Sequence, residues 1–416
     1  MSRQFFHWII IAALSVLLAC KPGDELAKSY PGKITINVEN PTDLLRVDSF
    51  VGVNLSKVAE KCQKPVLDKG SFVVMIEGRE VPSQLADNWL YFTADFAPWE
   101  KKKVTIRYPL ESVEEQQYPQ RAHAELSKKV GGHFEGNHYI GGQFQPVSCE
   151  KVPKVHVDHD TYYRFEGPGW ESDKVGYRFY LDQRNRIDIF GKKVTQMVLP
   201  NVELDGFDSY HEMSDWGADI FKVGESLGIG SIGTFFNGAV QQIYETDSIY
   251  FKILSDGPVV AEMQTKYYDW KVGDRNYDLQ SNLSIHAGSR LTKHKVKVSD
   301  DLENLVTGLI KTDGCDYIRG DFQTNSKWNY IALWGKQSLM GDNLGTALFF
   351  RNADLIEISD DELNHLVILK PEAGKLNYYF AAAWEGEPDG VKTRAEFVDY
   401  LDQTVQELNV PIKVIY

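Results

Sequence analysis

The chain has 416 residues, a hydrophobic content of 43% and a formal net charge of −14. This length and composition allow two or three domains with sizeable cores. Because the chain is acidic and has no basic block, nucleic acid is not an expected partner, and an acidic substrate would need a local cluster of cationic side chains.

The N-terminus has the pattern of an export signal. Arg3 supplies a positive charge, and the apolar stretch 8–18 has the length of a signal peptide but is too short to span a membrane. The sequence LLAC ending at Cys20 resembles the bacterial lipoprotein lipobox. This resemblance implies a signal peptide over 1–19, lipid attachment at Cys20, a tether over 20–32 and, by analogy, location at the outer membrane of a Gram-negative bacterium.

The remaining cysteines do not form a scaffold. Cys62, Cys149 and Cys315 can form at most one internal disulfide, and the sequence does not say which. No two of them are close enough in sequence to suggest zinc.

Residues 33–108 alternate in the manner of short strands. Ile34, Ile36 and Val38 share one face of the first strand, and Asn40-Pro41 is a turn signal. The spacing predicts a small β-sandwich over 33–108, similar to the immunoglobulin-like modules that precede many bacterial polysaccharide-processing domains. We expect a linker over 109–130.

Two histidine-containing segments follow. Residues 131–142, GGHFEGNHYIGG, contain His133 and His138, and His159 lies next to acidic residues further on. Imidazoles and carboxylates together could bind a divalent metal such as Ca²⁺, Zn²⁺ or Mn²⁺. No defined ligand motif is matched, so a hairpin tip with hydrogen-bonded histidines is the alternative, and no cofactor is certain.

A turn at 167–169 leads into paired strands over about 170–190. Trp170 follows this turn as a candidate sugar platform, and Glu171 is a candidate acid, base or hydroxyl ligand. Glu171 could equally form a structural ion pair with Arg178 or Lys174.

The stretch 209–233, SYHEMSDWGADIFKVGESLGIGSIG, is rich in both glycine and functional side chains. So many glycines disfavour a helix or a regular strand and predict a long shaped loop, which tends to carry function. The candidates in this loop are Tyr210, His211, Asp215, Trp216, Asp219 and Lys222. The alternative is a well-packed glycine loop with a capping Asp and a buried Trp.

Beyond residue 259 the chain is almost entirely strand-like. In 279–286, apolar residues alternate with Gln280, Asn282, Ser284 and His286, which gives one packed face and one polar face. The number of strands predicts a large two-sheet antiparallel assembly over 131–416. The chain ends with a predicted helix, whose start is marked by a capping box formed by Thr393 and Glu396.

The central stretch, the preceding GPGWESDKVGYRFYLDQRNRIDIFGK and the closing YYFAAAWEG resemble the bacterial family catalogued as domain of unknown function 4861, over about 33–416. The resemblance implies an exported protein of polysaccharide-degrading bacteria that acts on uronic-acid glycans such as pectin, alginate or ulvan. It also implies an all-β fold in which a galactose-mutarotase-like β-supersandwich follows the small module.

The first functional hypothesis is a β-eliminating polysaccharide lyase. His211 is its candidate base, because the unperturbed imidazole pKa is near neutrality, and Tyr210 is its candidate acid. Adjacent side chains of an extended segment face opposite ways, so Tyr163 or Tyr277 is the alternative acid if the loop is extended there. Arg184, Arg290 and Lys222 are candidates to neutralise the uronate carboxylate, a contribution comparable to that of an oxyanion hole.

Three alternatives stay open. A glycoside hydrolase needs two carboxylates, which Asp215, Asp219, Glu212 and Glu171 could supply. A surface lipoprotein could bind glycans without catalysis through tryptophan platforms, and an epimerase or mutarotase could use His and Glu. The density of titratable groups in one loop favours an enzyme. We expect an acidic glycan as partner and membrane contact only through the lipid anchor, and the oligomeric state is open.

Overall fold

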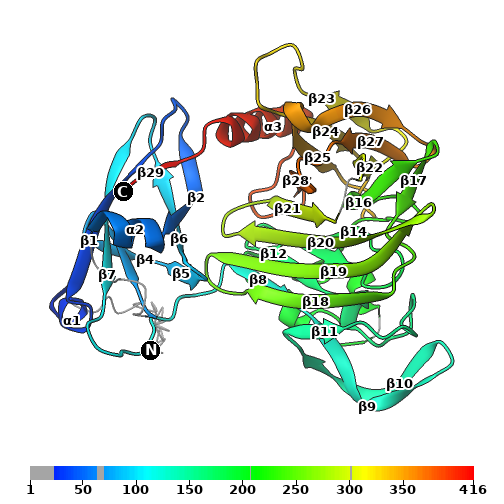
Figure 1. The fold of residues 1–416 in the computed structure, drawn as a ribbon, viewed down its shortest axis with the longest axis horizontal. Coiled ribbons are helices and arrows are strands. Elements are labelled where there is room, and N and C mark those ends of the chain that lie inside the picture. Colours follow the sequence, from blue (N-terminus) through cyan, green and yellow to red (C-terminus); the bar gives the residue numbers. More distant parts are fainter. Residues whose placement is uncertain (1–22, 63–69, 207, 300–301) are drawn as a thin grey trace, which may run out of the picture.

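The computed structural model describes residues 23–62, 70–206, 208–299 and 302–416 (Figure 1). The expected signal peptide, the lipobox and Cys20 lie outside these ranges and stay predictions. Within the described ranges, no helix is long and apolar enough to cross a membrane. Cys149 and Cys315 are free thiols.

The small β-sandwich is confirmed at the N-terminal end. One sheet has the order β29 (Lys413–Ile415), β1 (Gly32–Glu39), β7 (Lys101–Tyr108), β3 (Val73–Ile76), β4 (Arg79–Val81). The other has the order β2 (Arg46–Asn54), β6 (Trp89–Phe96), β5 (Ser83–Ala86), and helix α2 (Leu55–Cys62) follows β2. Val38, Val53, Phe92 and Val104 are fully buried between the sheets, as the alternating pattern requires.

Three boundaries differ from the expected division. Residues 23–29 form helix α1 (Gly23–Ser29) rather than a plain tether, because Leu26 and Tyr30 are one helical turn apart and both pack against Val73. Strand β8 (Ala122–Glu125) lies within the expected linker but pairs with the large domain. The last strand, β29, leaves the large domain and pairs with β1.

The large domain is built from antiparallel sheets, as predicted, but its described residues form three large sheets rather than two. Its nine-stranded sheet has the order β11 (Cys149–Lys151), β18 (Ser248–Ser255), β19 (Val260–Val272), β20 (Arg275–His286), β21 (Leu291–Val298), β28 (Lys375–Trp384), β25 (Leu344–Arg351), β24 (Trp328–Gly335), β23 (Asp316–Arg319). One five-stranded sheet has the order β15 (Gly217–Asp219), β14 (Ile187–Lys192), β13 (Val175–Phe179), β12 (Gly169–Ser172), β8. The other has the order β17 (Ala239–Gln242), β16 (Ile229–Phe236), β22 (Leu305–Ile310), β27 (Asn364–Leu369), β26 (Leu355–Asp360).

Two further elements complete the fold. The hairpin of β9 (Ser127–Glu135) and β10 (His138–Pro146) projects from the large domain (Figure 1). Helix α3 (Arg394–Asn409) begins at the predicted capping box, in which the Thr393 side chain accepts from the Glu396 amide. The all-β fold class, with a small sandwich, a large antiparallel assembly and a C-terminal helix, is therefore confirmed.

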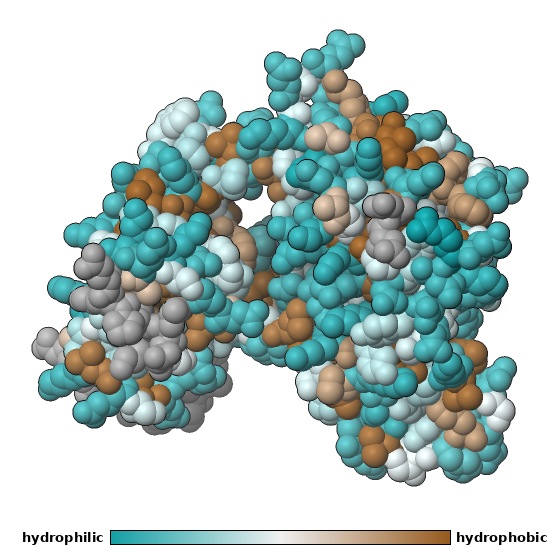
Figure 2. All heavy atoms as spheres, viewed as in Figure 1, coloured by the Kyte–Doolittle hydropathy of each residue, from teal (hydrophilic) through white to brown (hydrophobic). Residues whose placement is uncertain are grey.

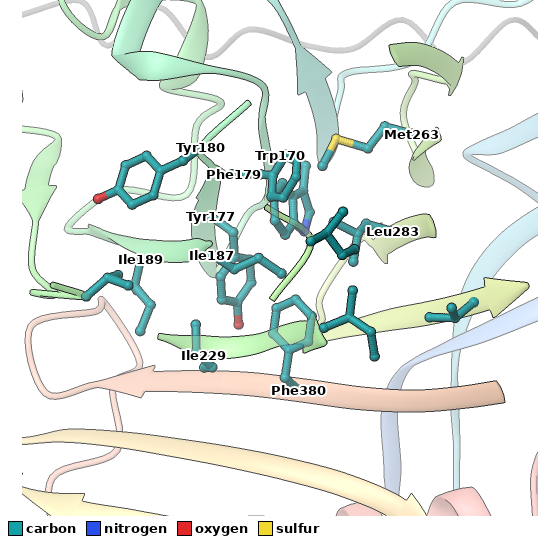
Figure 3. Packing of buried hydrophobic residues seen from close by; sticks show 14 of the residues in the cluster. Trp170, Tyr177, Phe179, Tyr180, Ile187, Ile189, Ile229, Met263, Leu283 and Phe380 are labelled. Carbon is teal, nitrogen blue, oxygen red and sulfur yellow. The ribbon is translucent and has the colours of Figure 1, made fainter. Parts of the chain in front are cut away.

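The main core lies between the nine-stranded sheet and the two five-stranded sheets (Figure 3). Trp170 is 1% exposed, stacks on Tyr177 with ring centroids 5.5 Å apart, and donates to Thr292 Oγ1 at 2.8 Å. A sugar cannot reach this ring, so the expectation that Trp170 is a platform is wrong. The indole occupies the core because its large apolar area and its N–H both find partners there.

Candidate functional site

The candidate site is built on one end of the β12–β15 sheet. Arg178 on β13 and Asp188 on β14 are direct cross-strand partners, and β15 brings Asp219 alongside. Arg178 Nη2 donates to Asp188 Oδ2 at 2.6 Å and to Asp219 Oδ2 at 2.7 Å. All three side chains are at most 2% exposed. One buried guanidinium therefore fixes two carboxylates, a geometry suited to its planar fork.

Burial and charge shift the titration of this group. Burial, reinforced by the neighbouring Asp219, raises the pKa of Asp188 to about 6. The Tyr180 hydroxyl donates to Asp188 Oδ2 at 2.7 Å. The Asp188 carboxyl therefore titrates nearer to neutral pH than an ordinary Asp, as groups at functional sites often do.

His211 extends this network to the solvent. The short 3₁₀ turn η4 (Ser209–His211) buries Tyr210 and leaves 45% of the His211 side chain exposed. The imidazole Nδ1 lies 3.3 Å from Asp219 Oδ2. Contact with this carboxylate raises the pKa of His211 above its ordinary value, against the opposing effect of burial. An accessible imidazole is thereby oriented by a buried carboxylate.

Tyr210 does not share this accessibility. It is 2% exposed, its ring lies 4.9 Å from the Arg178 guanidinium, and its hydroxyl donates to Asp208 at 3.0 Å. Burial raises the pKa of Tyr210 far above its ordinary value. These contacts contradict the expectation that Tyr210 is the catalytic acid and make it a packing partner of Arg178.

A second set of charges adjoins the first through Glu166. Glu166 Oε2 lies 3.5 Å from Arg178 Nη1, and Glu166 Oε1 accepts from Arg184 Nη2 at 3.1 Å. Arg184 Nη2 also contacts Asp158 at 2.8 Å and Asp182 at 2.6 Å. Arg184 is therefore part of the site, as predicted, but it is already held by three carboxylates.

The pKa values of the Asp158 and Glu166 carboxyl groups are shifted in opposite directions. Burial, followed by a hydrogen bond to Glu166, raises the pKa of Asp158. Although burial opposes it, the attraction of Arg178 and Arg184 lowers the pKa of Glu166 to about 2. The result is a partly exposed carboxyl that keeps its proton to higher pH than an ordinary Asp, beside a carboxylate that loses its proton more readily than an ordinary Glu.

The backbone next to this pair is strained. Phe165 and Glu166, two consecutive residues that are not glycine, have φ angles of 39° and 66°. Such angles cost energy and persist where the surrounding structure enforces them, often at functional sites. Here they place the Glu166 carboxylate between Arg178 and Arg184.

Among the described residues, Asp158, His159 and Glu166 form a group that could hold a metal ion, with ligand atoms within 4.8 Å of one another. His159 therefore lies beside two carboxylates rather than with the other two histidines considered from the sequence. His133 and His138 do not join it: both are exposed on the projecting hairpin, and His133 contacts Glu135 at 2.8 Å. The Arg184 guanidinium already supplies a positive charge to Asp158 and Glu166, and a bound metal stays a hypothesis.

Glu171 is a structural residue, contrary to its predicted catalytic role. Glu171 and Lys192 are both 0% exposed and form an ion pair with 2.5 Å between Oε2 and Nζ. Glu171 Oε1 accepts from the backbone amides of Val198 and Leu199, each at 2.8 Å. The partner is Lys192 rather than either residue considered from the sequence.

The other predicted catalytic and binding residues lie apart from the network or at its edge. Asp215 and Lys222 are exposed and form no hydrogen bond or ion pair with the described residues. Trp216 is half-buried and packs edge-on against Phe190 at 6.0 Å. Arg290 Nη2 lies 2.6 Å from Glu387 and faces a different cavity. The structure therefore joins His211, Asp219, Arg184 and His159 in one network, with Tyr210 packed behind it.

Sequence reasoning missed Arg178, Asp188, Glu166 and Asp158 as site residues. The sequence contains one signal for two of them. Arg178 and Asp188 lie within mainly apolar stretches, whose composition is typical of buried strands. A charge in such a strand must find a buried partner, because burying it alone costs several kcal/mol (about 3–5 by mutation).

Comparison with solved structures finds remote similarity. An α-mannosidase from Enterococcus faecalis V583 superposes with a TM-score of 0.44 at 9% identity, over 92% of this chain and 46% of that one. A glycosyl hydrolase family 38 protein from E. faecalis superposes with a TM-score of 0.42 at 9% identity, over 91% of this chain and 47% of that one. A putative aldose 1-epimerase from Klebsiella pneumoniae subsp. pneumoniae MGH 78578 superposes with a TM-score of 0.31 at 9% identity, over 59% of this chain and 84% of that one.

The chain thus spans less than half the length of the two hydrolases, and at these scores no function follows from the likeness. A comparison with curated protein sequences finds no match. The model of the family described as domain of unknown function DUF4861 matches residues 38–414. Because this match covers most of the sequence, the chain belongs to the DUF4861 family.

Proposed function

We propose that this protein is a carbohydrate-active enzyme that uses His211 for proton transfer, and specifically a lyase that cleaves uronic-acid glycans by β-elimination. The observation that carries the proposal is the accessible His211 imidazole held against Asp219, which Arg178 fixes in turn. The uronic-acid substrate comes from the family resemblance.

The geometry suits His211 to the role of base. In the neutral imidazole, a proton on Nδ1 facing Asp219 leaves Nε2 as the proton acceptor. Nε2 takes the C5 proton of the uronate, and the electron pair of the broken C–H bond forms the C4–C5 double bond as the C4–O bond breaks. The leaving oxygen needs a proton from an acid.

Asp158 is the better candidate for that acid now that Tyr210 is buried. Its carboxyl is 42% exposed and its pKa is raised, so it can carry a proton at higher pH than an ordinary Asp. It belongs to the same chain of contacts as His211, which runs through Glu166, Arg178 and Asp219.

The carboxylates offered for hydrolysis fit less well. A glycoside hydrolase needs two reactive carboxyl groups on either side of the scissile bond. Glu171 and Asp219 are buried in ion pairs. Asp215 and Glu212 are exposed, and their carboxylates form no hydrogen bond or ion pair with the network within the described residues. This arrangement favours histidine chemistry over a carboxylate pair.

The test is product analysis on defined oligosaccharides. Purified protein is incubated with oligogalacturonate, alginate and ulvan fragments, with and without EDTA, and the ultraviolet absorbance of the new C4–C5 double bond is followed together with reducing ends. The control is His133→Ala, because His133 is also an exposed histidine beside a carboxylate but lies on the hairpin.

We expect absorbance to rise with wild-type protein and His133→Ala and to stay flat with His211→Ala. New reducing ends without absorbance would replace elimination with hydrolysis. If no substrate gives a product but binding is measurable, the proposal of an enzyme is contradicted and a glycan-binding protein is the remaining interpretation. A loss of activity in EDTA would assign a metal to the reaction.

A further inference from the structure

A second candidate site lies between the small sandwich and the large domain. A cavity of about 660 Å³ is bordered by β2 and β6 on one side, by β19, β20, β21 and β28 on the other, and by α3. Figure 2 shows the molecule hollowed between its two lobes, and Figure 1 shows α3 above this hollow. The volume is within the range of small-molecule binding sites.

One wall of the cavity is a continuous stack of rings. Trp89 stacks on Tyr91 at 6.3 Å, Tyr91 on Phe50 at 5.0 Å, and Phe50 on His286 at 4.7 Å, with interplanar angles of 17° or less. The first three rings belong to the small sandwich and His286 to the large domain. His286 belongs to the polar face of the strand expected from the sequence, and here this face meets the other module.

Two cations in the lining form no ion pair with a carboxylate of the described residues. Arg46 is 2% exposed; its Nη2 donates to the Val410 carbonyl at 2.5 Å, and its buried Nε has no hydrogen-bond partner among the described residues. The Lys293 ammonium is half-buried, 5.6 Å from the Tyr379 ring centroid, and forms no hydrogen bond or ion pair with the described residues. Burial lowers the pKa of both side chains, against the opposing attraction of Glu407 for Arg46 and of Glu262 for Lys293.

The neighbouring charges are already engaged. Arg290 is paired with Glu387 at 2.6 Å, and Lys295 with Glu262 at 3.4 Å. Glu407 also lines the cavity and attracts Arg46, but the two form no ion pair. A buried cation without a partner is costly, and an anion in the cavity would remove that cost.

We infer that this cavity binds a negatively charged oligosaccharide, whose carboxylates contact Lys293 and are attracted by the buried Arg46 guanidinium behind the lining, while its sugar rings lie against the aromatic wall. Polar side chains that suit sugar hydroxyls, including Ser284, Gln403 and Thr404, complete the lining. The choice of an anion rests on the cavity itself, whereas the choice of a saccharide rests on the proposed function. No lining residue belongs to the His211 network, so this is a separate site.

The experiment measures binding by calorimetry in the His211→Ala background, which prevents turnover. The probes are trigalacturonate and its fully methyl-esterified, uncharged counterpart. We expect trigalacturonate to bind at least about tenfold more tightly than the ester, and Lys293→Met to remove about tenfold of that affinity. The affinity for trigalacturonate should also fall as salt is added.

The matched control is Lys297→Met, because Lys297 lies on the same face of β21 but outside the cavity. It should bind trigalacturonate as the parent does. Trp89→Ala, at a residue 38% exposed, should weaken binding of both probes. Circular dichroism confirms that each variant is folded.

Equal binding of the two probes, or unchanged binding in Lys293→Met, would overturn the inference. The two proposals fail separately. An inactive wild-type protein that binds trigalacturonate through Lys293 contradicts the lyase alone, and an active enzyme whose Lys293→Met variant binds normally contradicts the cavity site alone.

Discussion

Two buried carboxylates on the same sheet, Glu171 on β12 and Asp219 on β15, show how differently similar ion pairs are used. Glu171 and its partner Lys192 are both 0% exposed. Asp219 is 2% exposed, but its partner His211 is 45% exposed. We call Glu171 and Lys192 the closed pair, because solvent reaches neither side chain. We call Asp219 and His211 the open pair, because the buried carboxylate contacts an imidazole that a substrate can reach.

The contacts of each carboxylate explain this difference. Lys192 and two backbone amides saturate Glu171, and Lys192 also donates to the Ser172 carbonyl at 2.6 Å. Glu171 therefore ties β12 to the loop at 198–199 and to β14. Asp219 instead shares its Oδ2 between Arg178 and His211, so its charge acts on the imidazole. A buried carboxylate indicates function when its contacts lead to an accessible titratable group.

The largest expected effect is on activity at the open pair. His211→Ala should lower kcat/KM by about 10²–10⁴-fold, the usual contribution of a general base. Its melting temperature should change little, because the side chain is largely exposed. Steady-state kinetics and thermal melting measure the two effects, and a variant that keeps its activity would remove His211 from the mechanism.

The closed pair should respond in the opposite way. Glu171→Gln leaves the Lys192 ammonium buried without its counter-charge and should cost about 3–5 kcal/mol of unfolding free energy. Chemical denaturation measures this loss. At low temperature, where the variant is still folded, kcat/KM should stay within a few-fold of wild type. A stable but inactive Glu171→Gln would move Glu171 into the active site.

Acid should lower the stability of the folded protein through Glu166, which belongs to the same network as His211. Its pKa is lowered from 4.5 to about 2 in the folded protein, so its contribution to stability is fully present above about pH 4.5 and is lost as the pH falls toward 2. The contribution is on the order of 3 kcal/mol at neutral pH. Unfolding free energies measured across this range should fall less steeply in Glu166→Gln, and parallel curves would contradict the assignment.

The smallest effect is a shift in pH dependence. Asp219 raises the pKa of His211, so Asp219→Asn should lower that pKa and move the ascending limb of the pH profile of kcat/KM to lower pH. Activity should fall less than in His211→Ala. An ascending limb at the wild-type position would show that another group titrates there.

The sequence predicted the elements better than their contacts. Alternating apolar residues identified the strands, and Thr393 with Glu396 marked the start of α3, because both signals are local. The site depends on pairs such as Glu166 with Arg178 and Asp219 with His211, which the sheet brings together from different segments. Local patterns do not specify such distances.

Two errors have a similar cause. Trp170 suits a buried core and an exposed platform equally well, and burial alone decides between them. Strand β29 has only three residues and pairs with a sheet that begins almost four hundred residues earlier, so no local signal distinguishes it from a tail. In both cases tertiary packing supplies the missing information.

The most direct test of the open and closed pairs is one assay with three proteins. Wild type, His211→Ala and Glu171→Gln are compared for elimination of oligogalacturonate at low temperature and for thermal stability. We predict that His211→Ala is stable and inactive, whereas Glu171→Gln is active and unstable. The reverse pattern, an active His211→Ala and a stable but inactive Glu171→Gln, would contradict the placement of the chemistry at His211.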